Sequence, residues 1–235
     1  MRFRDKIKKP RRPVVTYEIL PPREKDGTLN SYAEKISSLL SQTHIDAINI
    51  PEVREEEGRG KRPVVNSSRA EPRHFGRLLQ DMVGVESIVN RVVVHDELKN
   101  QIKWFEETHE KYEIENMIIV GGESSKIKYI GPTVNQILEL VAFKYNNNGG
   151  DILCGGITLP TRSNESKNLI RKSGNGAEFF TTQVLCDAEN IVKMMNKYQE
   201  RCDALDTFPR RILLSFAPIS SGKNIQFLKW LGVEI

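Results

Sequence analysis

The stretch Ile152–Gln183, ILCGGITLPTRSNESKNLIRKSGNGAEFFTTQ, holds the pattern that predicts the fold. It opens with the apolar run Ile152–Leu159 and closes with the run Phe179–Gln183, each of strand length. The polar segment between them is long enough for a helix. Two strands joined in this way pair in parallel through a right-handed crossover, so the stretch predicts one βαβ unit.

The same alternation continues on both sides of this unit. Segments with helical spacing separate the predicted strands, which are Val14–Leu20, Asp46–Ile50, Arg91–His95, Met117–Val120, Ile152–Leu159, Phe179–Gln183 and Arg211–Ala217. Seven strand–helix pairs are too many for a simple doubly wound sheet and one short of a closed (β/α)8 barrel. We therefore expect residues 14–235 to form a single α/β domain, a TIM-type barrel that lacks the last strand–helix unit.

The charge of the chain is unevenly distributed. The net charge is +4, but the first 12 residues hold seven basic side chains and one acidic one, which leaves 28 basic and 30 acidic residues in positions 13–235. A near-neutral body makes a dedicated nucleic-acid-binding protein improbable. The basic tail, residues 1–13, is suited to contact with nucleic acid or an acidic surface, but a solvated, frayed terminus is the favoured interpretation.

The cysteines and histidines predict no metal site. Cys154, Cys186 and Cys202 are widely spaced and form no CxxC pair, and the four histidines lack an HExxH spacing. Three isolated cysteines fit a reducing cytoplasm, and neither a signal-peptide core nor a membrane-spanning run is present. We expect a cytoplasmic protein.

Active sites of such barrels lie at the carboxyl ends of the strands, and the first predicted strand ends with a carboxylate. Glu18 and Leu20 share one face of this strand. If that face lines the barrel, desolvation raises the pKa of Glu18 and makes it a usable proton donor. A salt bridge to Arg23 or to a lysine of the tail is the structural alternative and is slightly favoured on these residues alone.

The next two strand ends offer weaker candidates. Asn49 ends the second strand and is a candidate substrate contact. His95 and Asp96 end the third strand, where such a pair is able to do acid–base work or bind a metal. Adjacent residues on a strand point apart, however, and Asp96 is more easily interpreted as the N-cap of the next helix.

The later strand ends carry glycines, a carboxylate, a lysine and an amide. Gly122 allows a ligand to approach the backbone, and Glu123 follows it, although an ordinary turn explains both. Lys172 suits a phosphate, and the Gln183 amide suits a ring with paired donors and acceptors. No GxGxxG, P-loop or GxSxG motif is present, so a Rossmann-type nicotinamide site is unsupported.

Together, three segments resemble the methylenetetrahydrofolate reductase family. These are Tyr17–Pro22 (YEILPP), Arg171–Gln183 (RKSGNGAEFFTTQ), which is followed by Asp187, and Leu214–Ser220 (LSFAPIS). Their order and spacing match the family over about residues 14–235. The Lys-to-Thr-Gln segment is the most specific of the three.

The resemblance implies an NAD(P)H-dependent flavoprotein of one-carbon metabolism and methionine biosynthesis. The family reduces 5,10-methylenetetrahydrofolate to the 5-methyl form on a barrel that carries FAD. By motif, Glu18 matches the general acid that opens the folate ring, and Glu123 falls where a carboxylate stabilises the iminium ion. Gln183 matches the amide that contacts the pterin. Lys172 matches a contact to the cofactor phosphate, and the predicted cofactor set is completed by Gly122, His95 and Ala177.

Three positions depart from the family's usual flavin contacts, namely Gly121, Leu159 and Ser163. We therefore expect weaker FAD retention than in a typical family member, with FAD still the expected cofactor if one is bound. The leading interpretation is a reductase. The alternative is a non-catalytic or partner-dependent pterin-binding subunit of a methyl-transfer system, and an aldolase-type barrel is a distant third. Open edges on the first and seventh strands predict self-association or a partner chain.

Overall fold

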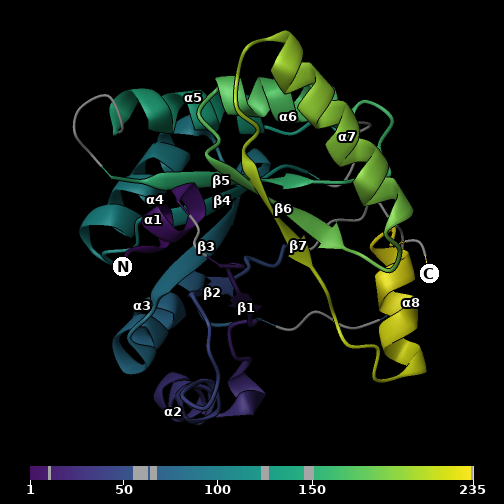
Figure 1. Cartoon of the computed structure of the whole chain (residues 1–235). Helices are drawn as coiled ribbons and strands as arrows, with labels where there is room; N and C mark the ends of the chain where they lie inside the picture. Colours follow the sequence, from purple (N-terminus) through teal and green to yellow (C-terminus); the bar gives the residue numbers. More distant parts are fainter. Residues whose placement is uncertain (10–11, 55–62, 64–67, 123–126, 146–150, 234) are drawn as a thin grey trace.

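Seven strands, each hydrogen-bonded in parallel to its neighbours in sequence, form the framework of the protein (Figure 1). The computed structural model describes residues 1–9, 12–54, 63, 68–122, 127–145, 151–233 and 235. The elements are α1 (Phe3–Lys8), β1 (Thr16–Glu18), η1 (Glu24–Asp26), α2 (Leu29–Leu40), β2 (Ala47–Ile50), α3 (Pro72–Val83), β3 (Glu86–Val92), η2 (Val93–His95), α4 (Leu98–Glu110), β4 (Asn116–Val120), α5 (Val134–Lys144), β5 (Leu153–Thr158), α6 (Glu165–Gly174), β6 (Phe179–Val184), α7 (Glu189–Ala204), β7 (Arg211–Ser215) and α8 (Gly222–Trp230).

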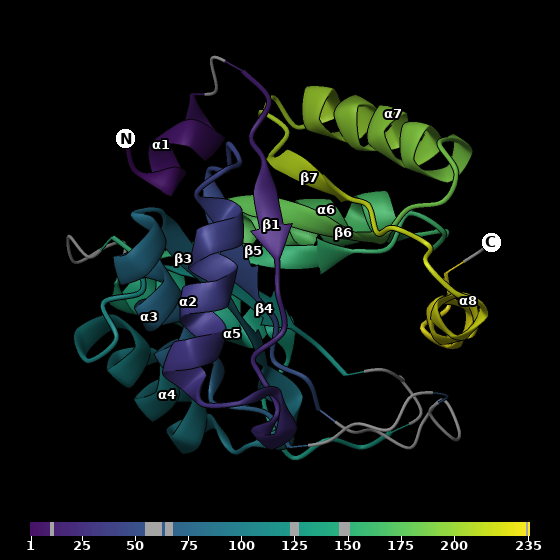
Figure 2. The same ribbon diagram turned by 90° about the horizontal axis from the view of Figure 1, so that it is seen from below.

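Helices α2 to α7 cover the outer face of the curved sheet (Figures 1 and 2). Their apolar stripes are buried against it. The central strands are covered on both faces, and for that reason β2 is buried at all four of its positions. Side chains alternate along each strand between the outer layer and the hollow of the sheet, which we call the lumen. The outer core includes Ile48, Val89 and Met117, whereas Ala47, Ile88 and Ile118 face the lumen.

The sheet is an open, curled half-barrel. Its order is β1-β2-β3-β4-β5-β6-β7, and in the described residues β1 and β7 are not paired with each other. This confirms the predicted (β/α) barrel-type fold without a closing eighth unit. None of the described helices is long and apolar enough to span a membrane.

The third strand lies earlier in the chain than the sequence pattern predicts. We expect it over Arg91–His95, but β3 spans Glu86–Val92, and the next three residues form a short 3₁₀ helix. Polar residues interrupt the apolar pattern of β3, yet the structure accommodates them. Ser87 donates a hydrogen bond of 2.6 Å to the carbonyl of Gly76, and Arg91 is neutralised by carboxylates.

Helix α1 fills the amino-terminal end of the lumen. Phe3 is fully buried, Ile7 is 3% exposed, and the Phe3 ring packs edge-on against Phe179 with centroids 5.8 Å apart. Gly155 makes this packing possible, because a Cβ at that position would lie 2.5 Å from the Phe179 ring. The predicted solvated, frayed terminus is therefore wrong.

The basic residues of this helix face a ring of acidic residues at the starts of the strands. The acids stand at or just before the first residue of five consecutive strands: Asp46, Glu86, Glu115, Asp151 and Glu178. Their ion-pair partners in the N-terminal segment are Arg2, Arg4, Lys6, Lys8 and Arg12. The sequence suggested an acidic surface as a partner of the basic tail, and this surface is provided by the same chain.

Asp46 is the most buried of these acids. Burial favours a higher pKa for its carboxyl, but hydrogen bonds from the Val15 amide, Arg12 and Lys6 outweigh burial and lower the pKa. The contact with Arg12 is 2.8 Å long. Asp46 therefore ties the N-terminal segment to the start of β2.

Substitution Phe3→Ala is expected to lower the free energy of unfolding by about 3–5 kcal/mol, since it empties a fully buried ring site. The measurement is equilibrium urea unfolding. Phe208→Ala is the matched control, because Phe208 is 91% exposed and its removal should change stability by less than about 0.5 kcal/mol. Equal stability of Phe3→Ala and the control would show that α1 does not dock in solution.

Candidate functional site

The carboxyl end of the lumen carries polar side chains, in contrast to the apolar end filled by α1. Glu18 and Asn49 are opposite each other in the β1–β2 register. Side chains on one face of a strand recur at every second residue. Glu18 lies four residues after Val14, and Asn49 lies two residues after Ala47. Val14 and Ala47 belong to the apolar cluster in the lumen, so Glu18 and Asn49 also face the lumen. On the far side of the sheet, the hydroxyls of Thr181 and Ser215 lie 3.1 Å apart.

Glu18 is a solvent-accessible carboxylate inside a concave protein surface. Asn49 Nδ2 donates a hydrogen bond of 2.7 Å to Glu18 Oε2, and Asn49 itself is only 8% exposed. Desolvation by the surrounding sheet raises the pKa of Glu18, and the hydrogen bond from Asn49 opposes the shift without cancelling it. This environment favours a carboxyl that is able to hold a proton at a higher pH than an exposed glutamate.

The salt-bridge alternative for Glu18 is not observed in the described part of the chain. Arg23 is paired with Asp26 at 3.0 Å instead. Lys6 is paired with Asp46 and Lys8 with Glu178, both at the opposite end of the lumen. The Glu18 carboxylate therefore has an amide as its observed partner rather than a cation.

Gln183, the predicted substrate contact, is engaged within the protein. Its Nε2 donates a hydrogen bond of 2.6 Å to the carbonyl of Leu231, in the turn that follows α8. Helix α8 accordingly lies beyond the carboxyl end of β6, on the side of the sheet opposite α1 (Figure 2). A ligand that contacts the Gln183 amide has to displace this turn or share the amide with it.

His95 and Gly122 both lie against Tyr129. The rings of His95 and Tyr129 meet edge-to-face with centroids 5.5 Å apart. A Cβ on Gly122 would lie 2.1 Å from the Tyr129 ring, so the space that this glycine leaves open is filled by a side chain of the protein. Gly122 thus serves packing here.

Asp96 belongs to an ion-pair network and not to a helix cap. Arg91 is buried and donates to Asp96 at 2.7 Å, to Glu52 at 2.8 Å and to Gln101 at 2.9 Å. The N-cap of α4 is Glu97, which makes no side-chain capping bond. The interpretation of Asp96 as the cap is therefore wrong, and the network instead joins the ends of β2 and β3.

Lys172 and Ala177 lie in the outer layer. The Lys172 ammonium donates to the carbonyl of Ile157 at 2.6 Å and lies 3.8 Å from the buried carboxylate of Glu165. Desolvation lowers its pKa, and Glu165 opposes that shift. Ala177 is fully buried, and its N–H donates to the carbonyl of Lys172.

These contacts bear on the FAD expected from the sequence. A cofactor phosphate has to take Lys172 from Ile157 and Glu165, and Tyr129 occupies the space beside Gly122. The residues present therefore do not form a ready flavin site. Glu123, the predicted partner of the cationic intermediate, lies outside the described residues.

Sequence reasoning missed Asn90. This residue is 7% exposed, lies in β3, and shares the lumen face with Ile88. The sequence pattern predicts a strand that begins at Arg91, one residue later, so Asn90 falls outside it. The alternation Ile88–Asn90–Val92 is the pattern that was available to find it.

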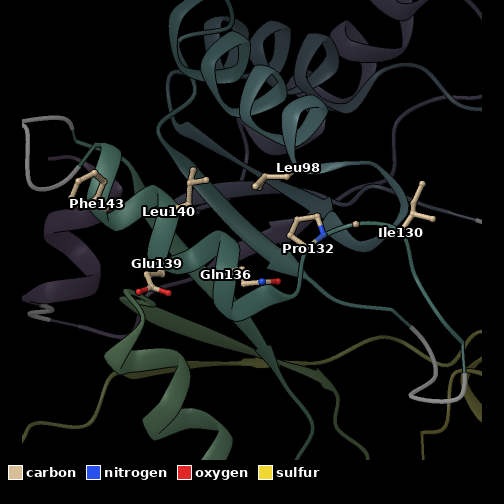
Figure 3. A pocket seen from close by; sticks show the side chains of 8 residues that line it. Leu98, Ile130, Pro132, Gln136, Glu139, Leu140 and Phe143 are labelled. Atoms are coloured by element: carbon tan, nitrogen blue, oxygen red, sulfur yellow. The ribbon is translucent and has the colours of Figure 1, made fainter.

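Two of the cavities that the described residues form lie outside the lumen. One of about 630 Å³ lies between α4 and α5, where Leu98, Gln136 and Phe143 are among its lining residues (Figure 3). The other, of about 500 Å³, is lined by Pro21, Pro51 and residues of the loop before α3. The second cavity adjoins the candidate site, because Pro21 and Pro51 follow Glu18 and Asn49 in the chain by three and two residues.

Comparisons with known proteins agree with this fold. A model of the methylenetetrahydrofolate reductase family matches residues 2–235. A protein from Clostridium thermocellum, which binds two copies of 5-methyl-5,6,7,8-tetrahydrofolic acid, is similar in structure, with a TM-score of 0.77, 19% identity, and coverage of 98% of this chain and 75% of that one.

More distant structures share only the fold. An oxaloacetate acetylhydrolase gives a TM-score of 0.57 at 10% identity, covering 99% of this chain and 76% of that one. A 2,3-dimethylmalate lyase gives 0.52 at 11% identity, covering 91% and 78%. No curated protein sequence matched the chain significantly.

Substitution Asn49→Val is expected to raise the pKa of Glu18 further, since the hydrogen bond that opposes desolvation is removed. The carboxyl carbon of Glu18 can be titrated by NMR and assigned with Glu18→Gln. Because the folded-state pKa is raised, Glu18 contributes stability below its ordinary pKa, and this contribution is lost as the pH rises through the folded value. Glu18→Gln should therefore gain stability relative to the wild type as the pH rises. A Glu18 pKa that stays the same or falls in Asn49→Val would contradict the assigned geometry.

Proposed function

Because this chain belongs to the methylenetetrahydrofolate reductase family, we propose that it binds a reduced folate in the lumen, at the carboxyl ends of its strands. The observation that carries this proposal is the Glu18–Asn49 pair, which places a carboxylate and a buried amide on the lumen face at the first-strand motif. Binding of 5-methyltetrahydrofolic acid by the similar clostridial protein supports the ligand class.

The chemistry of the lumen suits a reduced pterin. Such a ring presents N–H donors along its edge and apolar faces above and below. Carboxylate and amide oxygens accept from the donors, whereas the partly buried lumen residue Ile157 is available to a face of the ring. The ligand is held at this end because Phe3 and Phe179 fill the other.

A second candidate function is reduction of 5,10-methylenetetrahydrofolate, and the raised pKa of Glu18 favours it. Opening of the imidazolidine ring needs a proton on the departing nitrogen, and a carboxyl whose pKa is raised by desolvation is better suited to supply it than an ordinary exposed glutamate. The family resemblance assigns the hydride to a flavin reduced by NAD(P)H. The engaged Lys172 and the filled space at Gly122 argue for binding without a tightly held flavin, so folate binding is the first candidate.

Association with a second chain and a cytoplasmic location stay predictions. Among the described residues, the outer strands carry exposed apolar side chains beside their unpaired edges. Tyr17 on β1 is 50% exposed, and Phe216, which directly follows β7, is 75% exposed. Such edges favour pairing with another chain, and sedimentation analysis measures it.

The purified protein is expected to bind 5-methyltetrahydrofolate, measured by titration calorimetry, and to be isolated without flavin absorbance. Several lost polar contacts of about 1 kcal/mol each weaken flavin binding by a few orders of magnitude. Added FAD, titrated in the same way, is the comparison. Isolation with stoichiometric, tightly bound flavin would contradict this prediction, and absence of folate binding would sink the proposed function.

If reductase turnover is detected with NAD(P)H and added FAD, Glu18→Gln should lower folate reduction by about 10²–10⁴-fold, because the amide keeps the size of the side chain but donates no such proton. The circular dichroism spectrum and folate affinity of this variant report on fold and binding. Glu34→Gln, an exposed change on α2, is the control. Near-normal turnover in Glu18→Gln would show that the carboxylate is not the proton donor.

A further inference from the structure

Asn90 is a buried carboxamide on the lumen face of the sheet. It lies in β3, opposite Ile118 of β4 in the strand register. Ile118 belongs to the apolar cluster in the lumen, and so does Ile88, which precedes Asn90 on the same face of β3. Only 7% of Asn90 is exposed. Its position is two residues further along β3 than Ile88, which pairs with Asn49.

Two acceptor atoms in this part of the lumen have no hydrogen bond from the described residues. They are Asn90 Oδ1 and Asn49 Oδ1, and both are buried. The orientation of the Asn49 amide is set by the bond from its Nδ2 to Glu18, so its Oδ1 remains the free end. A buried acceptor without a donor destabilises a folded protein, and native structures contain few of them.

A third asparagine shows that the sheet is able to satisfy such a residue. Asn116 is 2% exposed at the start of β4, and its Nδ2 donates to the carbonyl of Ser87 at 3.3 Å. Asn116 therefore has a structural role in holding β3 and β4 together. Asn90 makes no such bond in the described part of the chain, although it is nearly as buried.

We propose that Asn90 is a ligand-binding residue, and that Asn49 and Asn90 form a pair of carboxamide acceptors for the N–H donors on the edge of a reduced pterin ring. The inference rests on the proposed folate binding and adds the residues that recognise the ring. A site built to accept hydrogen bonds discriminates strongly against ligands that cannot donate them, because its own polar atoms are then left unpaired. Asn90 thus selects the heterocycle rather than the remainder of the folate.

The test compares Asn90→Leu with Asn116→Leu, two changes of the same type at buried positions of adjacent strands. Asn90→Leu should weaken binding of 5-methyltetrahydrofolate by ~10-fold or more in titration calorimetry. It should leave the urea midpoint unchanged or raise it, because it removes an unpaired buried acceptor. Asn116→Leu should lower the midpoint, since it breaks an existing bond.

A second ligand separates ring recognition from contacts to the rest of the molecule. Asn90→Leu should weaken binding of 6-methyltetrahydropterin, which lacks the aminobenzoyl-glutamate portion, by the same factor as it weakens binding of 5-methyltetrahydrofolate. If Asn90→Leu does not fold, Asn90→Ala is measured by the same criteria.

The outcomes are distinct. If the wild type binds and the Asn90 variant loses less than twofold in affinity, the role of Asn90 is overturned and folate binding stands. A lowered urea midpoint in the Asn90 variant with unchanged affinity assigns Asn90 a structural role and also overturns the proposal. Failure of the wild type to bind either ligand overturns the proposed function and this inference together.

Discussion

The edge-on packing of Phe3 against Phe179 inside the curved sheet determines how the two ends of the lumen are used. An open half-barrel has too few strands to fill its own hollow with strand side chains. Helix α1 supplies the missing apolar volume, and Gly155 leaves room for it. Because this end is occupied, polar chemistry is confined to the carboxyl ends of the strands, where barrel folds place their sites.

The opposite end of the lumen departs from ordinary core packing. A carboxylate with a raised pKa, a buried amide and an unpaired acceptor lie there on the faces of three consecutive strands. Each of these groups costs folding free energy unless it has a partner. Departures of this kind concentrate at functional sites, and the outer layer provides the stability that offsets them.

Periodicity predicted most of the strand positions, because strands buried on both faces are continuous apolar runs. Six of the seven predicted strands agree with the structure within two residues at each end. The prediction of the third strand was wrong because Asn90 and Arg91 interrupt its apolar run. Asn90 faces the lumen and Arg91 is held in a buried ion-pair network, and a linear pattern shows neither environment. Strand alternation put Glu18 and Leu20 on one face but left open whether that face lines the lumen, and the register with Asn49 now places Glu18 there. Motif matching named Lys172 and Gln183 as ligand contacts. It did not reveal that the Lys172 ammonium and the Gln183 amide have partners within the protein, since a motif specifies residue types and not their contacts.

The position of α1 also sets an order on folding during synthesis. Every strand pairs with the strand next to it in the sequence, so the sheet can extend one unit at a time as the chain leaves the ribosome. Helix α1 is made before all of these strands, yet its apolar face contacts Phe179, and Arg211 donates a hydrogen bond to the carbonyl of Ile7. The α1 segment must therefore wait, with Phe3 and Ile7 exposed, until most of the strands that follow it are in place. A nascent chain at that stage presents both an unfilled hollow and a free amphipathic segment to the chaperones that bind such surfaces.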